Sequence, residues 1–182
     1  MKTCRTWALL ATVAGSCLGS ALAQDAAHPA GTVPAGGPPP PPAKTLTLES
    51  ALVLAQGAIS ACQAQGYTVS VSVVDSAGLA KVTLGADSVG RTLTTVRKAA
   101  AATAFEAAGS ELEARAARDA QFAAKVAADN RYNIHAGSLP IRVGGEVVGG
   151  IGLSGAPTHE QDEACARSAL LKYQGDLHVY TP

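Results

Sequence analysis

The stretch LPIRVGGEVVGGIGLSG, residues 139–155, predicts a β-hairpin in the last third of the chain. Its two arms, 139–143 and 146–153, are rich in branched apolar residues, and Gly144-Gly145 between them is a strong two-residue turn signal. Glycine also recurs inside the second arm. Glycine within a strand is typical of a place where another backbone or a ligand comes close. We therefore expect a helix, a ligand or a neighbouring subunit to lie against this arm.

The end of the same stretch matches the G-x-G-x-x-G pattern of dinucleotide-binding sites, from Gly150 to Gly155. Such a site needs its glycines directly between a strand and a helix, early in a β-α-β unit. Here they lie largely inside a hairpin strand, and Pro157 and Thr158 delay the next helix. The residues around Ser154 do not form G-x-S-x-G, and no His/Asp pattern nearby supports a catalytic triad. The sequence therefore supports neither a dinucleotide site nor a serine nucleophile.

A second hairpin is predicted nearer the N-terminus, where valine alternates with serine over 69–73 and a turn at 75–78 leads into a strand over 79–84. Helical patterns occupy four further segments: 48–65, 88–108, 111–128 and 159–174. The predicted order is α-β-β-α-α-β-β-α. Two hairpins separated by helices indicate an α+β domain with a mainly antiparallel sheet.

The first 23 residues have the order of a secretory signal peptide. Lys2 and Arg5 precede a short apolar run, and Ala21-Leu22-Ala23 offers small residues for cleavage. We therefore predict that residues 1–23 direct export to the periplasm or the medium and are removed. The alternatives are an apolar helix retained in the fold and a lipoprotein signal that ends at Cys17.

Residues 24–44 are predicted to form a flexible linker rich in proline and glycine, because they hold almost no large apolar side chain. The folded domain is predicted over 45–177, a length typical of a single hydrophobic core, and 178–182 as a C-terminal tail.

The charge balance argues against some partners. The chain has 14 Lys and Arg against 14 Asp and Glu, and loss of Lys2 and Arg5 with the signal peptide leaves 12 against 14, a net charge of −2. A near-neutral chain without a basic block gives no support for nucleic-acid or membrane-surface binding. No segment after the signal peptide has the length and apolar composition of a membrane span.

Cleavage would leave two cysteines, Cys62 and Cys165, in the first and the last predicted helices. Outside the cytoplasm they can form one disulfide if these helices touch. Two buried, unpaired thiols are the alternative.

Polar residues follow one face of the second predicted helix. Arg91, Thr94, Thr95 and Lys98 are spaced i, i+3, i+4 and i+7. Two cations with two hydroxyls can bind a carboxylate or a phosphate, but an ordinary solvated helix face has the same pattern. None of the histidines has the spacing of a multi-histidine metal site, so each of them is by itself typical of a solvated loop residue.

Five segments carry a family resemblance. They are VSVSVVDSAG at 69–78, Lys98-Ala99, Ala104-Phe105, the hairpin at 139–155 and Asp162-Glu163-Ala164. In this order, over roughly Leu46 to Leu171, they resemble the GlcG/HbpS-like family, also called the haem-degrading domain family. The resemblance implies a profilin-like fold with about five antiparallel strands, helices on both faces and homo-oligomeric assembly. It also implies haem binding, although some members sit among genes of organic-acid metabolism.

The chain departs from the pattern of this family in two places. Ala101 stands where many members have a hydroxyl residue, so one possible iron ligand is missing. His135-Ala136-Gly137-Ser138 replaces the proline-glycine-glycine segment that many members have before the hairpin, and this change brings in a histidine.

The resemblance therefore implies candidates for a haem site. The candidate iron ligands are His135 first, then His159 and Tyr132, and the candidate partners of the propionates are Arg91, Lys98 and Arg142. Because only 4% of the residues are aromatic, we expect a shallow site, between subunits or open to solvent. Haem breakdown there would come from exposed iron, without dedicated acid–base residues.

The alternative function is non-catalytic binding or sensing of a small organic acid. Such a ligand would use Lys98 and the glycine-rich backbone from Gly150 to Gly155. For a ligand of either kind, the candidate binding residues are Arg91, Thr94, Lys98, Arg142, Gly152 and Ser154. A third alternative is a purely structural oligomer module. Whether the chain has any enzymatic activity stays open at this point.

Overall fold

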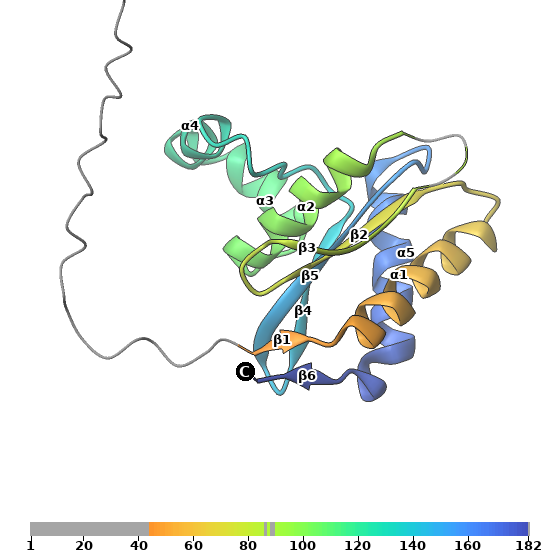
Figure 1. Cartoon of the computed structure of the whole chain (residues 1–182). Coiled ribbons are helices and arrows are strands. Elements are labelled where there is room, and N and C mark those ends of the chain that lie inside the picture. The colour runs from red at the N-terminus through yellow and green to blue at the C-terminus, as the bar shows by residue number, and fades with distance from the viewer. Residues whose placement is uncertain (1–43, 86, 88–89, 182) are drawn as a thin grey trace, which may run out of the picture. The chain divides into compact units, whose positions relative to one another are not determined.

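The computed structural model describes residues 44–85, 87 and 90–181, so the predicted signal peptide and all of the predicted linker except Lys44 lie outside the described residues. The main sheet is antiparallel, with the strand order β3-β2-β5-β4 (Figure 1). The strands span Ala80–Leu84 for β3, Ser70–Asp75 for β2, Glu146–Ser154 for β5 and Ser138–Val143 for β4. The predicted α+β class with its two hairpins is confirmed.

Helices cover both faces of this sheet (Figure 1). On one face lie α1 (Leu48–Gln63) and α5 (His159–Tyr173), and on the other lies α2 (Thr92–Phe105). Two short helices follow α2, namely α3 (Gly109–Ala116) and α4 (Ala120–Ala127), and the 3-10 helix η1 (Gln174–Asp176) follows α5. In the part of the chain that the structure describes, no helix is long and apolar enough to cross a membrane.

The observed element order contains the predicted one with three differences. The predicted helix over 111–128 is two helices, because Asp119 begins α4 by accepting a hydrogen bond from the N–H of Phe122. The second predicted helix begins at Thr92 instead of 88. The short strands β1 (Thr45–Leu46) and β6 (Val179–Tyr180) pair with each other, so the main sheet has four strands and a second sheet has two.

The hydrophobic core lies between the sheet and the pair α1 and α5. Val71 and Val73 of β2 and Ile151 and Leu153 of β5 point into it and are fully or almost fully buried. A disulfide joins Cys62 of α1 to Cys165 of α5, with their Cα atoms 5.3 Å apart. The two helices touch as the disulfide prediction required, and the bond ties them together inside the core.

The opposite face of the sheet is built from small residues, which let α2 approach the backbone of β5. A Cβ atom on Gly152 would lie 2.7 Å from the backbone N of Ala99 and would also meet the carbonyl oxygen of Thr95. A Cβ atom on Gly150 would meet Thr103 Oγ1 and the carbonyl oxygen of Ala99. Of the three partners expected against the glycine-rich arm, the helix is therefore the one observed.

We predict that Gly152→Ala lowers the free energy of unfolding by about 1–3 kcal/mol, because the added methyl group meets helix backbone that cannot turn aside. Urea denaturation followed by circular dichroism measures this change. Gly175→Ala is the matched control, since a Cβ atom there has no neighbour within 4 Å. Equal stability of the two variants would contradict the close contact between α2 and β5.

Candidate functional site

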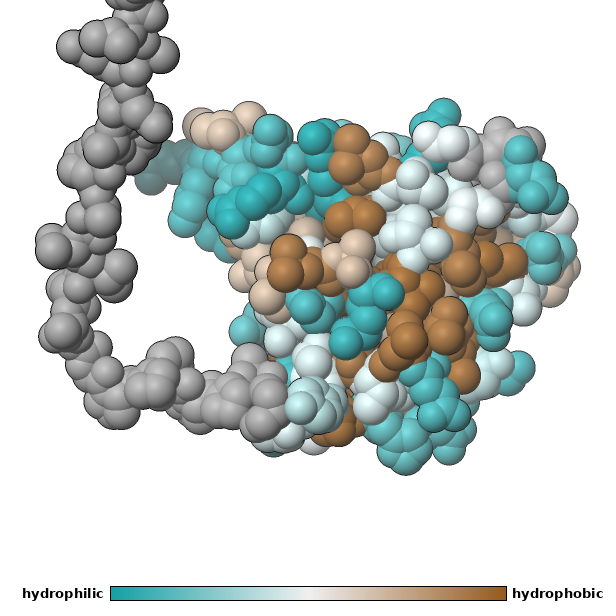
Figure 2. Space-filling view, viewed as in Figure 1, coloured by the Kyte–Doolittle hydropathy of each residue, from teal (hydrophilic) through white to brown (hydrophobic). Residues whose placement is uncertain are grey.

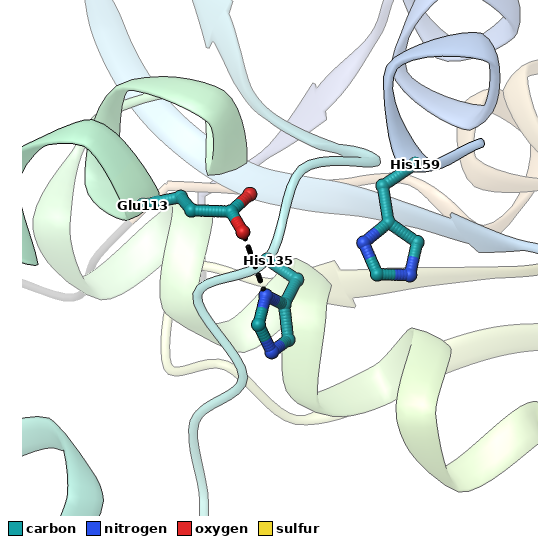
Figure 3. A group of neighbouring side chains, drawn as sticks. All are labelled: Glu113, His135 and His159. Carbon is teal, nitrogen blue, oxygen red and sulfur yellow. Dashed lines mark hydrogen bonds and ion pairs between the residues drawn. The ribbon is translucent and has the colours of Figure 1, made fainter. Parts of the chain in front are cut away.

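Three polar side chains from distant segments meet on one surface of the domain (Figure 3). Glu113 comes from α3, His135 from the loop before β4, and His159 from the first turn of α5. One potential ligand atom from each lies within 4.8 Å of those from the other two. We call these three residues the His–Glu cluster.

Local structure fixes each member of the cluster. Thr158 caps α5 by accepting a hydrogen bond from the N–H of Gln161, and the Gln161 side chain accepts one from the N–H of Thr158. This capping box places His159 in the first helical turn. In the loop, Asn133 Oδ1 accepts a hydrogen bond from the N–H of His135, and Glu113 Oε2 accepts one from the N–H of Ala136.

The two histidine rings lie side by side, with their centroids 5.3 Å apart. His135 Nδ1 is 3.0 Å from Glu113 Oε1, as the dashed line in Figure 3 marks. The His135 and Glu113 side chains are 56% and 45% exposed, so the cluster is open to solvent. The hydrogen bond from His135 holds the pKa of Glu113 below its ordinary value. Glu113 is therefore an ionised carboxylate at neutral pH.

A second carboxylate, Glu163 of α5, anchors the loop that carries His135. Its Oε1 and Oε2 accept hydrogen bonds from the hydroxyl and the N–H of Ser110, and Oε2 also accepts one from the N–H of Gly137. Because Glu163 is buried, these bonds join α3, the loop and α5 into one support under the cluster.

Beneath the cluster lies a buried ion pair, Lys98 of α2 and Asp162 of α5. Both side chains are only 1% exposed, and Lys98 Nζ is 3.8 Å from Asp162 Oδ2. Lys98 Nζ donates a hydrogen bond to the carbonyl of Leu153, and Asp162 Oδ1 accepts one from the N–H of Ala156. Burial lowers the pKa of Lys98 and raises the pKa of Asp162, because removal from water disfavours both charges.

A polar cavity of about 350 Å³ opens beside the cluster. Its lining combines the start of α2, the end of β5 and the first turn of α5, and comprises Gly90, Arg91, Ser154, Gly155, Ala156, Pro157, His159 and Asp162. Arg91, Ser154 and His159 were sequence candidates, so the structure brings three of them to one cavity.

The other candidates lie elsewhere. Lys98 is buried, and Thr95 beside it is bonded to Ser72, so the expected polar face of α2 lies against the sheet and only Thr94 and Arg91 remain accessible. The alternative of an ordinary solvated helix face does not hold at Thr95 and Lys98, because α2 packs closely on the glycines of β5 and buries both side chains. The α2 backbone also fills the space over Gly152.

Two further candidates are separated from the His–Glu cluster. The Arg142 guanidinium donates hydrogen bonds to the carbonyls of Gly145 and Glu106 and pairs with the Glu106 carboxylate. The Tyr132 ring packs on Phe105, 5.1 Å between centroids, and lines a different, more apolar cavity of about 380 Å³ between α2 and the turn at 76–79. Neither residue belongs to the set that the structure brings together around His135.

Sequence reasoning missed Glu113 as a site residue. A lone glutamate on a helix belongs to no recognisable sequence motif. Its role is visible only from its contacts with His135 and Ala136 in the loop before β4. Asp162 and Glu163 belonged to the family resemblance, which was the one signal that could have marked them.

The comparisons with known proteins agree with this architecture. The sequence profile of the family described as haem degrading protein HbpS-like matches residues 46–171. The chain belongs to the HbpS-like family. The predicted resemblance is thereby confirmed, and so is its span.

Solved structures of relatives support the same assignment. The double mutant of Streptomyces reticuli HbpS is 31% identical over 89% of this chain and 97% of its own, with a TM-score of 0.65. A structure of HbpS is 35% identical over 77% and 98%, with a TM-score of 0.68. A PduOC:heme complex is 25% identical over 75% and 98%, with a TM-score of 0.63. No curated protein matches the chain.

Proposed function

We propose that this HbpS-like chain is an exported haem-binding protein whose iron ligand is His135. The observation that carries the proposal is the exposed pair of imidazoles, His135 and His159, on a chain of a haem-degrading family. The heme complex of its relative PduOC supports haem as the bound group.

The cluster residues suit haem iron. A histidine that binds iron through one ring nitrogen usually donates its other N–H to a carboxylate or carbonyl, which fixes the ring. Glu113 Oε1 lies 3.0 Å from Nδ1 of His135 and can accept that bond, so Nε2 remains for the iron (Figure 3). His159 is the second candidate ligand, and Arg91 in the adjoining cavity offers a cation for a propionate.

The exposure of His135 argues for a shallow haem site. Haem would supply redox-active iron, and iron that is open to solvent can react with peroxide without help from acid–base residues. We therefore infer weak haem breakdown or haem sensing rather than a dedicated enzyme, and expect that a homo-oligomer covers part of the bound haem.

Export is supported by two features of the chain. The predicted signal peptide comprises residues 1–23. The disulfide between Cys62 and Cys165 is of a kind that persists in oxidising compartments and is rare in the cytoplasm.

A second candidate is the binding of a small organic acid in the polar cavity. Arg91 lines this cavity, and the N-terminus of α5 adds partial positive charge beside it. Carboxylates that occupy it would raise the melting temperature without a change in the haem spectrum.

A hemin titration tests the first proposal. We expect a saturable Soret shift with about one hemin per chain, and an affinity loss of about tenfold or more in His135→Ala, since an iron ligand is removed. His178→Ala is the matched control, because His178 is exposed and lies outside the cluster. Absence of a Soret shift at stoichiometric hemin would refute haem binding, and equal affinities of the two variants would refute His135 as the ligand.

A further inference from the structure

The His–Glu cluster offers two imidazoles and one carboxylate, a ligand set that also suits a free metal ion. Nitrogen and oxygen ligands of this kind bind zinc and other divalent first-row transition metals, and two histidines with one carboxylate leave open positions for water. We propose that Glu113, His135 and His159 form a binding site for one such ion, without a porphyrin.

The ligand atoms are close enough to reach one ion by a side-chain movement. Ligand atoms about 2.1 Å from a metal lie at most about 4.2 Å apart. Glu113 Oε1 and His135 Nδ1 are 3.0 Å apart, which corresponds to an angle of about 90° at a shared ion. The cluster atoms all lie within 4.8 Å of one another, and tetrahedral ligands at this distance from a metal lie about 3.4 Å apart, so binding requires the ligand atoms to close by up to about 1.4 Å. The His159 side chain is exposed and is free to make that change.

Hydrogen bonds hold the Glu113 carboxylate in an orientation that suits a metal ligand. Glu113 Oε2 is held by the N–H of Ala136, and Oε1 faces His135 Nδ1. A cation that replaced the proton between Oε1 and Nδ1 would keep the bond to Ala136 as an outer contact. Such outer contacts orient metal ligands and raise affinity.

The charges around the cluster leave room for a cation. The N-terminus of α5 repels a positive ion, but Glu160 and Asp162 lie in the same first turn. Glu160 is close enough to Glu113 for the two carboxylates to repel each other, so a second negative charge lies near the carboxylate of the cluster. A divalent ion would relieve this repulsion. Asp162 is paired with Lys98 and does not face the ion directly.

Glu113 would bind the metal ion directly, whereas in the haem site it would only orient the His135 ring. A carboxylate that only orients the imidazole can be replaced by an amide, whose oxygen still accepts the hydrogen bond. A carboxylate that binds the ion directly attracts it through its negative charge, and the neutral amide lacks that charge. Glu113→Gln therefore separates the metal site from the haem site.

Calorimetric titration with Zn²⁺, on protein purified without a histidine tag, tests the site. We expect about one ion per chain, with affinity reduced about tenfold or more in Glu113→Gln, His135→Ala and His159→Ala. His178→Ala is expected to bind like the original chain. Co²⁺ is expected to give a visible absorption spectrum that disappears in His159→Ala.

Two results would overturn the proposal. One is the absence of saturable Zn²⁺ binding, and the other is Zn²⁺ binding that is unchanged in Glu113→Gln and His159→Ala. Because these side chains are on the surface, melting temperatures close to that of the original chain verify that the variants fold. Failure of haem binding would appear in the Soret band alone, so the two proposals fail separately.

Discussion

Loss of the disulfide is expected to lower the free energy of unfolding by about 2–5 kcal/mol in the double variant Cys62→Ala, Cys165→Ala. The bond joins residues 103 positions apart. It therefore closes a long loop and restricts the conformations that most of the domain can adopt when it is unfolded. In the chain-entropy account, a loop of about 100 residues gives an effect near the upper end of this range. Alanine is the suitable replacement, because both sulfur atoms lie in the apolar core and serine would add buried hydroxyls.

Urea denaturation of the oxidised chain, the reduced chain and the double variant measures this effect. The reduced chain and the variant are expected to lose similar stability, whereas reductant should leave the variant unchanged. If reduction had no effect on the midpoint, the bond would contribute no stability. The disulfide argument for export would then also weaken.

The strands and helices could be predicted from the sequence where their patterns are long. The hairpin at 139–153 shows apolar arms and a Gly-Gly turn, and β4 and β5 follow it closely. The strands β1 and β6 have two residues each, too few to show alternation. The break between α3 and α4 contains neither glycine nor proline, so only the cap at Asp119 marks it, and an aspartate inside a helical pattern is a weak signal.

The candidate site could be predicted only in part. Helical spacing placed Arg91 and Lys98 on one face of α2, but spacing does not say whether that face meets solvent or the sheet. The sequence marked His135 and His159 as separate candidates. Their rings come together because the loop before β4 lies beside the start of α5. Glu113 had no signal at all, because its role comes from tertiary contacts alone.

The buried pair under the site gives the other large expected effect. Lys98→Met keeps most of the apolar length of the side chain but leaves Asp162 as a buried charge without its partner, so we expect a loss of about 3–5 kcal/mol in unfolding free energy at neutral pH. The double variant Lys98→Met, Asp162→Asn removes both charges. The amide oxygen can still accept the hydrogen bond from Ala156, so most of the lost stability should return.

The loss in Lys98→Met should also depend on pH. Burial raises the pKa of Asp162 above its ordinary value of 3.8, and removal of the lysine charge raises it further. The native state then holds the carboxyl proton at pH values where the unfolded chain has released it. Stability should therefore fall as the pH rises above that ordinary value, through the raised pKa of the folded state. Urea denaturation at pH 4.5 and pH 8, with the double variant as the control, measures this dependence. An unchanged stability of Lys98→Met at pH 8 would mean that the Asp162 charge does not need Lys98, and the buried ion pair would then have no part in holding α2 and α5 under the His–Glu cluster.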